Sequence, residues 1–184
     1  MPIYTKKGDT GTTSLFADTK ETRRLKDNPR IVAIGTVDEL NSNLGLVLAF
    51  LSTKASRVKK LILSLQEDLH KLAAELASPK GKPPFKIGSE RVSELEREID
   101  KMQLKLKPLK NFILPGGSKA GALMHQTRTI CRRTERELVT FTKKEKVNPE
   151  LLTYINRLSD LLFVLARTIN KLEGKRETVW KGRG

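Results

Sequence analysis

The chain has 184 residues and carries 36 lysines and arginines against 21 aspartates and glutamates, a formal net charge of +15 at pH 7. This length indicates one domain that can bury about two-thirds of the surface exposed by its unfolded chain. The single cysteine, Cys131, excludes an internal disulfide framework. With no secretory segment and no apolar run of about 18 residues, the sequence predicts a soluble cytoplasmic protein without a membrane partner. The basic excess taken by itself fits three kinds of polyanionic partner, nucleic acid, an acidic membrane surface or nucleotide phosphates, and charge alone does not choose among them.

The segment Ile3–Phe16, IYTKKGDTGTTSLF, has a composition that neither a helix nor a core strand favours. Gly8 and Gly11 permit positive φ and a close approach of the backbone. The hydroxyl groups and the two lysines of this segment can meet phosphate oxygens. The segment therefore predicts a loop shaped around an anion, and we assign residues 1–28 to an N-terminal nucleotide-binding arm.

Five helices are predicted after the arm, mainly from apolar residues spaced three and four apart. Capping side chains mark four of the starts: Asn28 and Asn148 each precede a proline, and Ser56 and Ser89 precede the other two helices. A connector rich in proline and glycine, 78–89, separates the second helix from the third. The helices are expected over about 30–51, 56–77, 90–106, 118–144 and 149–173.

The last of these helices carries leucines and isoleucines at alternating steps of four and three, the pattern of a seam in an antiparallel bundle. No strand-length run with period-two alternation is present to support a sheet. The sequence predicts an all-α fold, an antiparallel bundle of about five helices with a four-helix-bundle-like core and an ordered N-terminal arm. Within a single domain, 1–184, the bundle is assigned to 29–175 and a C-terminal tail to 176–184.

Polar stripes on the last two helices give a second indication of an anion site. Guanidinium groups bind phosphate in bidentate fashion, and an asparagine beside them can read a ribose or an adenine edge. The alternative is a solvated face with pairs such as Arg132 and Glu135, each worth a few tenths of a kcal/mol. The stripes comprise Arg128, Arg132, Glu135 and Arg136 on the fourth helix, and Asn156, Asp160, Phe163 and Arg167 on the fifth.

Five segments, in this order, are IYTKKGDTGTTSLF, GTVDELNSNLG, FILPGGS, RTICRRTERELV and NRLSDLLFVLAR, followed by ETVW. Together they resemble the signature segments of the PduO-type ATP:cob(I)alamin adenosyltransferases over about 3–181. The resemblance implies transfer of the 5′-deoxyadenosyl group of ATP to the Co(I) centre of a corrinoid such as cobalamin, with release of inorganic triphosphate. It also implies a homotrimer of helical bundles with active sites between subunits.

The resemblance assigns roles to both ends of the chain. In this family the arm folds over ATP, so its residues would cradle the triphosphate, which is the leaving group. The displacement requires no general base, which fits a chain whose two histidines, His70 and His125, are more typical of packing or surface positions. The ATP-binding residues implied for the arm are Thr5, Lys6, Gly8, Gly11, Thr13, Ser14 and Lys26.

The same resemblance implies further ATP contacts on the last two helices, and a catalytic set of Phe112, Arg132, Asp38 and Arg128. Phe112 matches the aromatic that lies beneath the corrin and displaces its lower axial ligand. Arg128 matches an arginine that pairs with an aspartate of a neighbouring subunit, the counterpart of Asp38. The further ATP contacts implied are Arg132, Arg133, Glu135, Arg136 and Asn156.

Two departures from the family pattern stand out. Thr134 replaces a common alanine and should fit if its hydroxyl bonds the carbonyl four residues earlier. Ile34 replaces a frequent tyrosine, so any contact of the tyrosine hydroxyl is lost. The net charge also exceeds what ATP binding requires, and lysines on the second and third helices account for part of it.

No histidine and cysteine cluster with zinc spacing and no Walker-type phosphate loop is present, so Mg²⁺ is expected to arrive with ATP and to be held mainly by phosphates and water. One alternative function is a regulatory bundle that binds ATP or adenosylcobalamin without turnover. Another is a basic helical protein that binds nucleic acid, which the 5% content of aromatic residues disfavours. If the chain is an adenosyltransferase, a reductase and an adenosylcobalamin-dependent acceptor enzyme are further possible partners.

Overall fold

The computed structural model describes residues 3–15, 18, 22–78, 83 and 85–182. Part of the predicted connector 78–89, Phe16 of the N-terminal segment and the last two residues of the tail lie outside the described residues. The helices are α1 (Pro29–Phe50), η1, a short 3₁₀ helix (Thr53–Ala55), α2 (Ser56–Ala77), α3 (Ser89–Gln103), α4 (Lys119–Thr142) and α5 (Glu150–Leu172).

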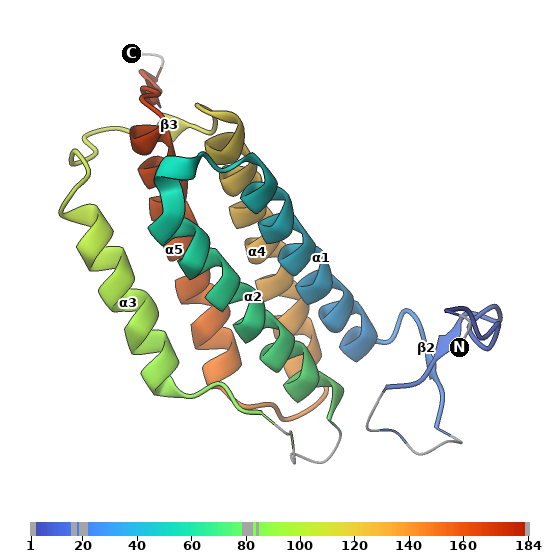
Figure 1. Ribbon diagram of the computed structural model, residues 1–184. Helices are drawn as coiled ribbons and strands as arrows, with labels where there is room; N and C mark the ends of the chain where they lie inside the picture. The colour runs from blue at the N-terminus through green and yellow to red at the C-terminus, as the bar shows by residue number, and fades with distance from the viewer. Residues whose placement is uncertain (1–2, 16–17, 19–21, 79–82, 84, 183–184) are drawn as a thin grey trace.

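The long helices α1, α2, α4 and α5 form a four-helix bundle, and α3 packs on the outside against α5 (Figure 1). Leu40 of α1, Leu69 of α2 and Leu162 of α5 are fully buried in one continuous core. At the border of that core, Asp68 accepts hydrogen bonds from Tyr154 Oη at 2.9 Å and from Arg91 Nε at 2.6 Å. These bonds tie α2, α5 and α3 together, so the predicted all-α bundle is confirmed.

The helix starts follow the sequence signals in part. Asn28 is the N-cap of α1 and accepts a hydrogen bond from the Arg30 N–H at 3.0 Å, so this predicted cap is confirmed. Asn148 accepts a hydrogen bond from the Glu150 N–H at 3.2 Å, but the N-cap of α5 is Pro149, so the predicted cap lies one residue too early. The predicted caps Ser56 and Ser89 are wrong. Each serine is already the first residue of its helix, preceded by a cap residue without a side-chain bond. The short 3₁₀ helix runs directly into α2 and removes the need for a serine cap there.

Two small antiparallel ribbons lie outside the bundle and were not predicted. In the arm, β1 (Thr12–Thr13) pairs with β2 (Arg24–Leu25). At the far end of the molecule, β3 (Ile113–Leu114) pairs with β4 (Thr178–Val179). The arm projects from the start of α1, at the end of the bundle remote from β3 (Figure 1). Since α1 has 22 residues and a helix rises about 1.5 Å per residue, the two ribbons are separated by most of a helix length.

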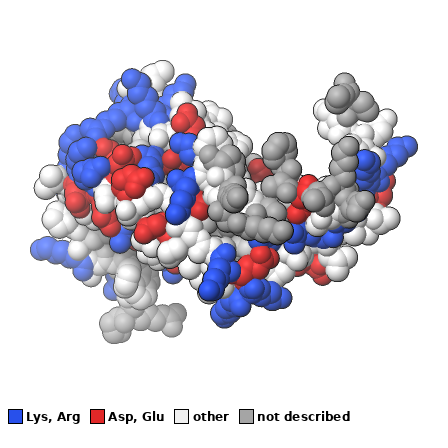
Figure 2. Space-filling model, turned by 90° about the horizontal axis from the view of Figure 1, so that it is seen from below, with Lys and Arg blue, Asp and Glu red and all other residues white. Residues whose placement is uncertain are grey.

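Two surface properties bear on the expected partners. By length and hydropathy α1 could cross a membrane, with a mean hydropathy of 1.2 over its best window, yet it packs its Ala33, Leu40 and Leu44 side chains into the protein core. On the end of the molecule away from β3, basic and acidic side chains lie side by side (Figure 2). The net charge of +15 therefore does not form a single basic field on that face, as a nucleic-acid platform would require.

Candidate functional site

The arm is held in a defined loop by its own backbone and by Arg23. The Lys26 N–H donates to the Gly11 carbonyl at 3.0 Å, and Gly11 has a φ of +77°, a conformation that favours glycine. The Arg23 guanidinium donates to Thr12 Oγ1 at 2.8 Å and to the Thr12 carbonyl at 3.0 Å. The loop predicted from the glycines is therefore present, closed by the β1–β2 pairing.

The exposed groups of this loop suit an anion. A Cβ atom built on Gly8 would lie 3.5 Å from Lys26 Nζ, so the lysine ammonium group sits against the glycine backbone. Thr5, Lys6 and Ser14 are exposed beside it. The predicted arm residues thus share one loop with cationic and hydroxyl groups open to solvent, and their contact with ATP stays a prediction.

An ion pair fixes the returning strand of the arm. Arg24 binds Asp18 through Nη2 at 3.1 Å, and the Asp18 side chain is almost fully buried. The hydrogen bond from Arg24 lowers the pKa of Asp18, an effect that outweighs the opposing influence of burial. The ionised pair anchors the loop while leaving Lys26 uncommitted to any salt bridge within the described residues.

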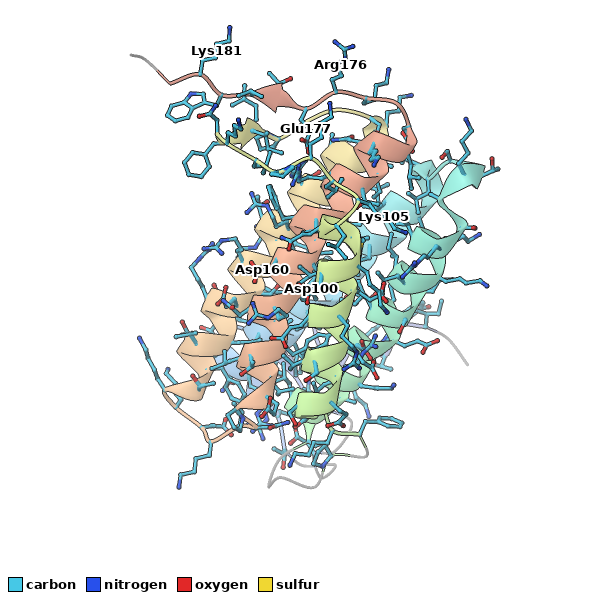
Figure 3. The ribbon with its side chains drawn as sticks, turned by 90° about the vertical axis from the view of Figure 1, so that its left-hand side faces the viewer. Asp100, Lys105, Asp160, Arg176, Glu177 and Lys181 are labelled. Atoms are coloured by element: carbon cyan, nitrogen blue, oxygen red, sulfur yellow. The ribbon has the colours of Figure 1, made fainter. Side chains whose placement is uncertain are left out.

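The predicted polar stripes meet across α4 and α5. Asn156 Nδ2 donates to Glu135 Oε1 at 2.9 Å. Arg128 and Arg132 line a cleft of about 570 Å³ together with Asp160 and other residues of α3 and α5. Figure 3 shows Asp160 of α5 and Asp100 of α3, both on the face that holds this cleft.

Two arginines of the predicted ATP set are engaged within the subunit. Arg133 forms an ion pair with Glu39 of α1, and Arg136 donates to the Arg132 backbone carbonyl at 3.1 Å. Arg132 itself is exposed and forms no ion pair among the described residues. Of this group, Arg132 is the arginine most available to an anionic ligand.

Asp38 and Arg128 are not brought together within one subunit. Asp38 is exposed on α1 and lines a separate cleft of about 330 Å³ with Thr13 of the arm and Ile34. Arg128 Nε is buried and has no hydrogen-bond partner within the described part of the chain. A buried guanidinium nitrogen without a partner is costly, so Arg128 is a candidate for a contact from outside this subunit.

Phe112 stands at the opposite end of the bundle from the arm. Its side chain is 79% exposed and lines a cleft of about 750 Å³ with Arg128, Phe163 and Trp180. Since Arg128 and Phe163 also line the 570 Å³ cleft, the two clefts adjoin. Because three aromatic side chains line this one cleft, the geometry favours an apolar ligand that covers Phe112.

The turn that follows Phe112 is secured by Asn170, a residue that the sequence analysis did not single out. Asn170 Oδ1 accepts from the Ser118 N–H at 2.9 Å, and Nδ2 donates to the Gly116 carbonyl at 2.8 Å. A Cβ on Gly117, whose φ is +109°, would lie 2.3 Å from Asn170 Oδ1, so glycine is required there. The sequence signal was the Gly116-Gly117 pair, but its partner lies 52 residues from Ser118 and could not be inferred from local spacing.

Two other buried residues lie near the clefts. Thr134 donates to the Ile130 carbonyl at 3.1 Å, four residues back, which confirms the expected accommodation of this hydroxyl. Cys131 is fully buried, and its thiol donates to the Ile155 carbonyl at 3.4 Å. Burial raises the pKa of this thiol well above its ordinary value, so Cys131 is not a nucleophile.

His125 is buried and packs edge-on against Phe163 with ring centroids 5.9 Å apart. Neither of its ring nitrogens has a hydrogen-bond partner among the described residues. Burial, followed by the nearby Arg128 charge, lowers the pKa of this histidine. In the described ranges no group of three or more His, Cys, Asp or Glu side chains could hold a metal ion.

This chain is similar to proteins of one family over nearly its whole length. A family model described as cobalamin adenosyltransferase matches residues 3–169. A corrinoid adenosyltransferase of Bacillus subtilis is 42% identical over 176 residues, which cover 95% of this chain and 89% of that protein. The corrinoid adenosyltransferase PduO of Salmonella typhimurium is 44% identical over 91% of this chain, and the match spans 49% of that longer protein.

A solved structure shares the fold in detail. A variant of a PduO-type ATP:corrinoid adenosyltransferase from Lactobacillus reuteri, complexed with cobalamin and ATP, superposes with a TM-score of 0.92 at 33% sequence identity. The comparison covers 98% of this chain and 100% of that chain.

Proposed function

The chain belongs to the cobalamin adenosyltransferase family, and we propose that it transfers the 5′-deoxyadenosyl group of ATP to the Co(I) centre of a corrinoid, with release of inorganic triphosphate. The observation that carries this proposal is Phe112, 79% exposed on the wall of a 750 Å³ cleft that adjoins the cleft of Arg128 and Arg132. A flat apolar macrocycle can cover the ring while a polar, charged ligand occupies the neighbouring cleft.

The reaction is a single displacement. The electron pair of Co(I) attacks the 5′ carbon of the ribose, a Co–C bond forms, and the C–O bond to the triphosphate breaks. No proton is transferred in this step, so no general base is needed. Negative charge develops on the departing oxygen, and groups that stabilise it there lower the barrier.

The arm supplies such groups. Lys6 and Lys26 would neutralise the triphosphate, while the backbone around Gly8 and Gly11 approaches it closely. Thr5, Thr13 and Ser14 would add hydroxyl donors. Mg²⁺ would be bound by phosphate oxygens and water, and its charge would further stabilise the leaving group.

The helical residues bind the rest of the nucleotide and the second substrate. Arg132, the Glu135–Asn156 pair, Arg133 and Arg136 would contact ATP. To contact ATP, Arg133 would have to give up its ion pair with Glu39 or bind both groups at once. Phe112 would lie under the corrin and displace the lower axial ligand, which leaves a four-coordinate Co(II) that is easier to reduce.

A trimer would complete the site. Within a subunit, the arm lies at the end of the bundle remote from β3 (Figure 1), and Asp38 and Arg128 line separate clefts. The buried Arg128 Nε has no hydrogen-bond partner among the described residues. An Asp38 side chain from a neighbouring subunit would provide that partner and would bring an arm to a corrinoid cleft. In the cytoplasm, a reductase would supply the electron, and an adenosylcobalamin-dependent enzyme would receive the product.

The test is an anaerobic spectrophotometric assay with chemically reduced cob(I)alamin, ATP and Mg²⁺. We expect loss of the Co(I) absorption and formation of a light-sensitive alkylcobalamin, dependent on both ATP and protein, with inorganic triphosphate as the second product. A folded protein that binds ATP without any conversion would instead indicate a regulatory binding function.

A further inference from the structure

The arm joins the bundle through one turn, and Arg30 lies just after it. The Asn28 N–H donates to the Leu25 carbonyl at 3.1 Å, which closes the turn between β2 and α1. Arg30 follows in the first turn of α1, and its side chain is only 7% exposed. The end of α2 and the turn between α4 and α5 lie at this same end of the bundle (Figure 1). Contacts that fix Arg30 therefore also fix the point from which the arm departs.

The Arg30 side chain joins the start of α1 to three neighbouring elements. Its Nη1 donates to the Leu76 carbonyl at 2.8 Å, in the last turn of α2, where carbonyls have no partner within the helix. The guanidinium carbon lies 5.1 Å from the centre of the Phe141 ring of α4, within the range of a cation–π contact. Nη2 forms an ion pair with Glu145, in the turn that follows α4. The guanidinium group is thus held in one orientation.

Glu145 also acts on the arm itself. In β2, Arg24 binds Asp18 through Nη2 at 3.1 Å. This hydrogen bond raises the pKa of Arg24, and the charge of the Glu145 carboxylate raises it further. The same hydrogen bond lowers the pKa of Asp18, and the Arg30 charge lowers it further. From the arm to the bundle, the charges of Asp18, Arg24, Glu145 and Arg30 therefore alternate in sign.

Glu145 is the accessible member of this series. Its side chain is 40% exposed, whereas those of Asp18 and Arg30 are almost fully buried. Among the described residues, Glu145 lines neither the 570 Å³ cleft nor the 750 Å³ cleft assigned to the substrates. An effect of Glu145 on ATP binding would therefore pass through the arm.

We propose that Glu145 is a positioning residue for the arm: by binding Arg30 of α1 and attracting Arg24 of β2, it sets the direction in which the arm leaves its own bundle. This inference rests on the proposed function, in which the arm reaches a cleft of another subunit. A change of direction at the base of the arm displaces the loop that carries Lys6 and Gly8. The apparent affinity for ATP then falls with the fraction of molecules whose arm is correctly directed.

The experiment compares Glu145→Gln with the unmodified protein. Glutamine keeps the size of the side chain and can still accept a hydrogen bond from Arg30, but it loses the charge that attracts Arg24. A partly exposed ion pair shifts a population by about two- to fivefold, so the Kd and the KM for ATP should rise by that factor. At saturating ATP, kcat should be unchanged, because the arm is then in place.

Hydrogen–deuterium exchange of the free protein gives a second readout that does not depend on turnover. The Lys26 N–H is bonded to the Gly11 carbonyl and the Asn28 N–H to the Leu25 carbonyl. In E145Q we expect faster exchange in peptides that contain these two amides. Exchange in peptides of the α5 core should be unchanged, since local opening of the arm does not require opening of the bundle.

Glu94→Gln is the matched control. The Glu94 side chain is 47% exposed and forms an ion pair with Arg91, so E94Q removes the same charge from a similar pair. Glu94 lies on α3, which packs on the outside of the bundle against α5. E94Q should change neither the exchange of the arm nor the KM for ATP.

Arg24→Gln distinguishes positioning of the arm from a general loss of stability. If Glu145 acts through Arg24, R24Q should raise the KM for ATP at least as much as E145Q does. Adding E145Q to R24Q should then raise the KM little further, because the two side chains act along one series of contacts.

Two outcomes overturn the inference. One is an unchanged arm exchange and KM in E145Q, even if its thermal midpoint falls, which would leave Glu145 a purely structural role. The other is a rise in KM on adding E145Q to R24Q that is as large as the rise in E145Q alone. Failure of the proposed function is recognised separately, because the unmodified protein would then not convert cob(I)alamin, while the exchange comparison would still report on the arm.

Discussion

The side-chain amide of Asn156 on α5 donates a hydrogen bond to the Glu135 carboxylate on α4 at 2.9 Å, which joins two predicted ATP contacts across neighbouring helices. The amide N–H stabilises the ionised carboxylate by donating to one of its oxygens. Asn156→Asp would place two carboxylates at hydrogen-bond distance, so we expect ATP to bind about tenfold more weakly in calorimetric titration. Ser93→Asp adds the same charge on the exposed side of α3 and should change the affinity less than twofold. Equal losses in both variants would contradict a local role for the pair.

The conformation of the arm at Gly11 should be disturbed by a larger residue. Its φ of +77° disfavours any L-residue, so Gly11→Ala should strain the loop by about 1 kcal/mol. We expect the KM for ATP to rise about fivefold while the thermal midpoint of the bundle is preserved, because the arm lies outside the core. In α1, Gly45→Ala meets only Gln66 Nε2, at 3.5 Å, and serves as the control, with an unchanged KM. A matching rise in KM for both would show that the loop conformation is unimportant.

Phe112→Ala tests the aromatic wall of the larger cleft. Its ring contacts Trp180 at the surface and takes no part in the core, so the fold should persist. If the ring controls cobalt coordination, kcat should fall about 100-fold or more while ATP affinity changes less than threefold. Stopped-flow kinetics and ATP titration separate the two effects. Parallel losses would mean that Phe112 acts only through the structure of its loop.

The unpaired Arg128 Nε and the exposed Asp38 predict a bond between subunits. Asp38→Arg or Arg128→Asp alone should weaken assembly, since each places like charges opposite one another. The double exchange restores opposite charges and should recover part of the assembly, as measured by analytical ultracentrifugation. A stable monomer of the unmodified protein would exclude this contact and the shared site with it.

Buried His125 predicts a loss of stability in mild acid. Burial lowers its pKa below the ordinary value of 6.5, so below about pH 6.5 the unfolded chain binds a proton that the folded chain resists. The free energy of unfolding should therefore fall as the pH drops from 6.5 toward the folded-state pKa. His125→Phe removes the titrating group and should flatten this slope in urea titrations at several pH values, whereas substitution of the exposed His70 should not. An identical slope in H125F would assign the acid sensitivity to other groups.

The bundle could be predicted because its information is local. Leu158, Leu162 and Leu165 repeat at helical spacing and all are fully buried, and Asn28 caps α1 as its position before proline indicates. The third helix ends at Gln103, three residues before the predicted end. Terminal turns depend on the following chain, and here it leaves toward Pro108 and Phe112.

The two β-ribbons and the hydrogen bonds of Asn170 to the turn after Phe112 could not be predicted, because the paired residues are distant in sequence. Ile113 pairs with Val179, and Ser118 bonds Asn170. A strand of two residues is too short to show alternation. The β-branched pair Thr178-Val179 after the helix-ending Gly174 was the one available signal. The sequence also could not show that Asp38 and Arg128 line separate clefts. The polar pattern of a helix identifies which side of the helix is polar, but it does not identify what that side contacts.

Because the thiol of Cys131 is buried, a cysteine introduced elsewhere in the chain can be labelled selectively. Its sulfur is inaccessible, and its raised pKa keeps it protonated, so maleimide reagents should leave it unmodified in the folded protein. A single cysteine introduced at exposed Asp9 in the arm would then carry a probe alone. The spectroscopic signal of this probe with and without ATP would show whether the arm changes conformation, and the native core would stay intact.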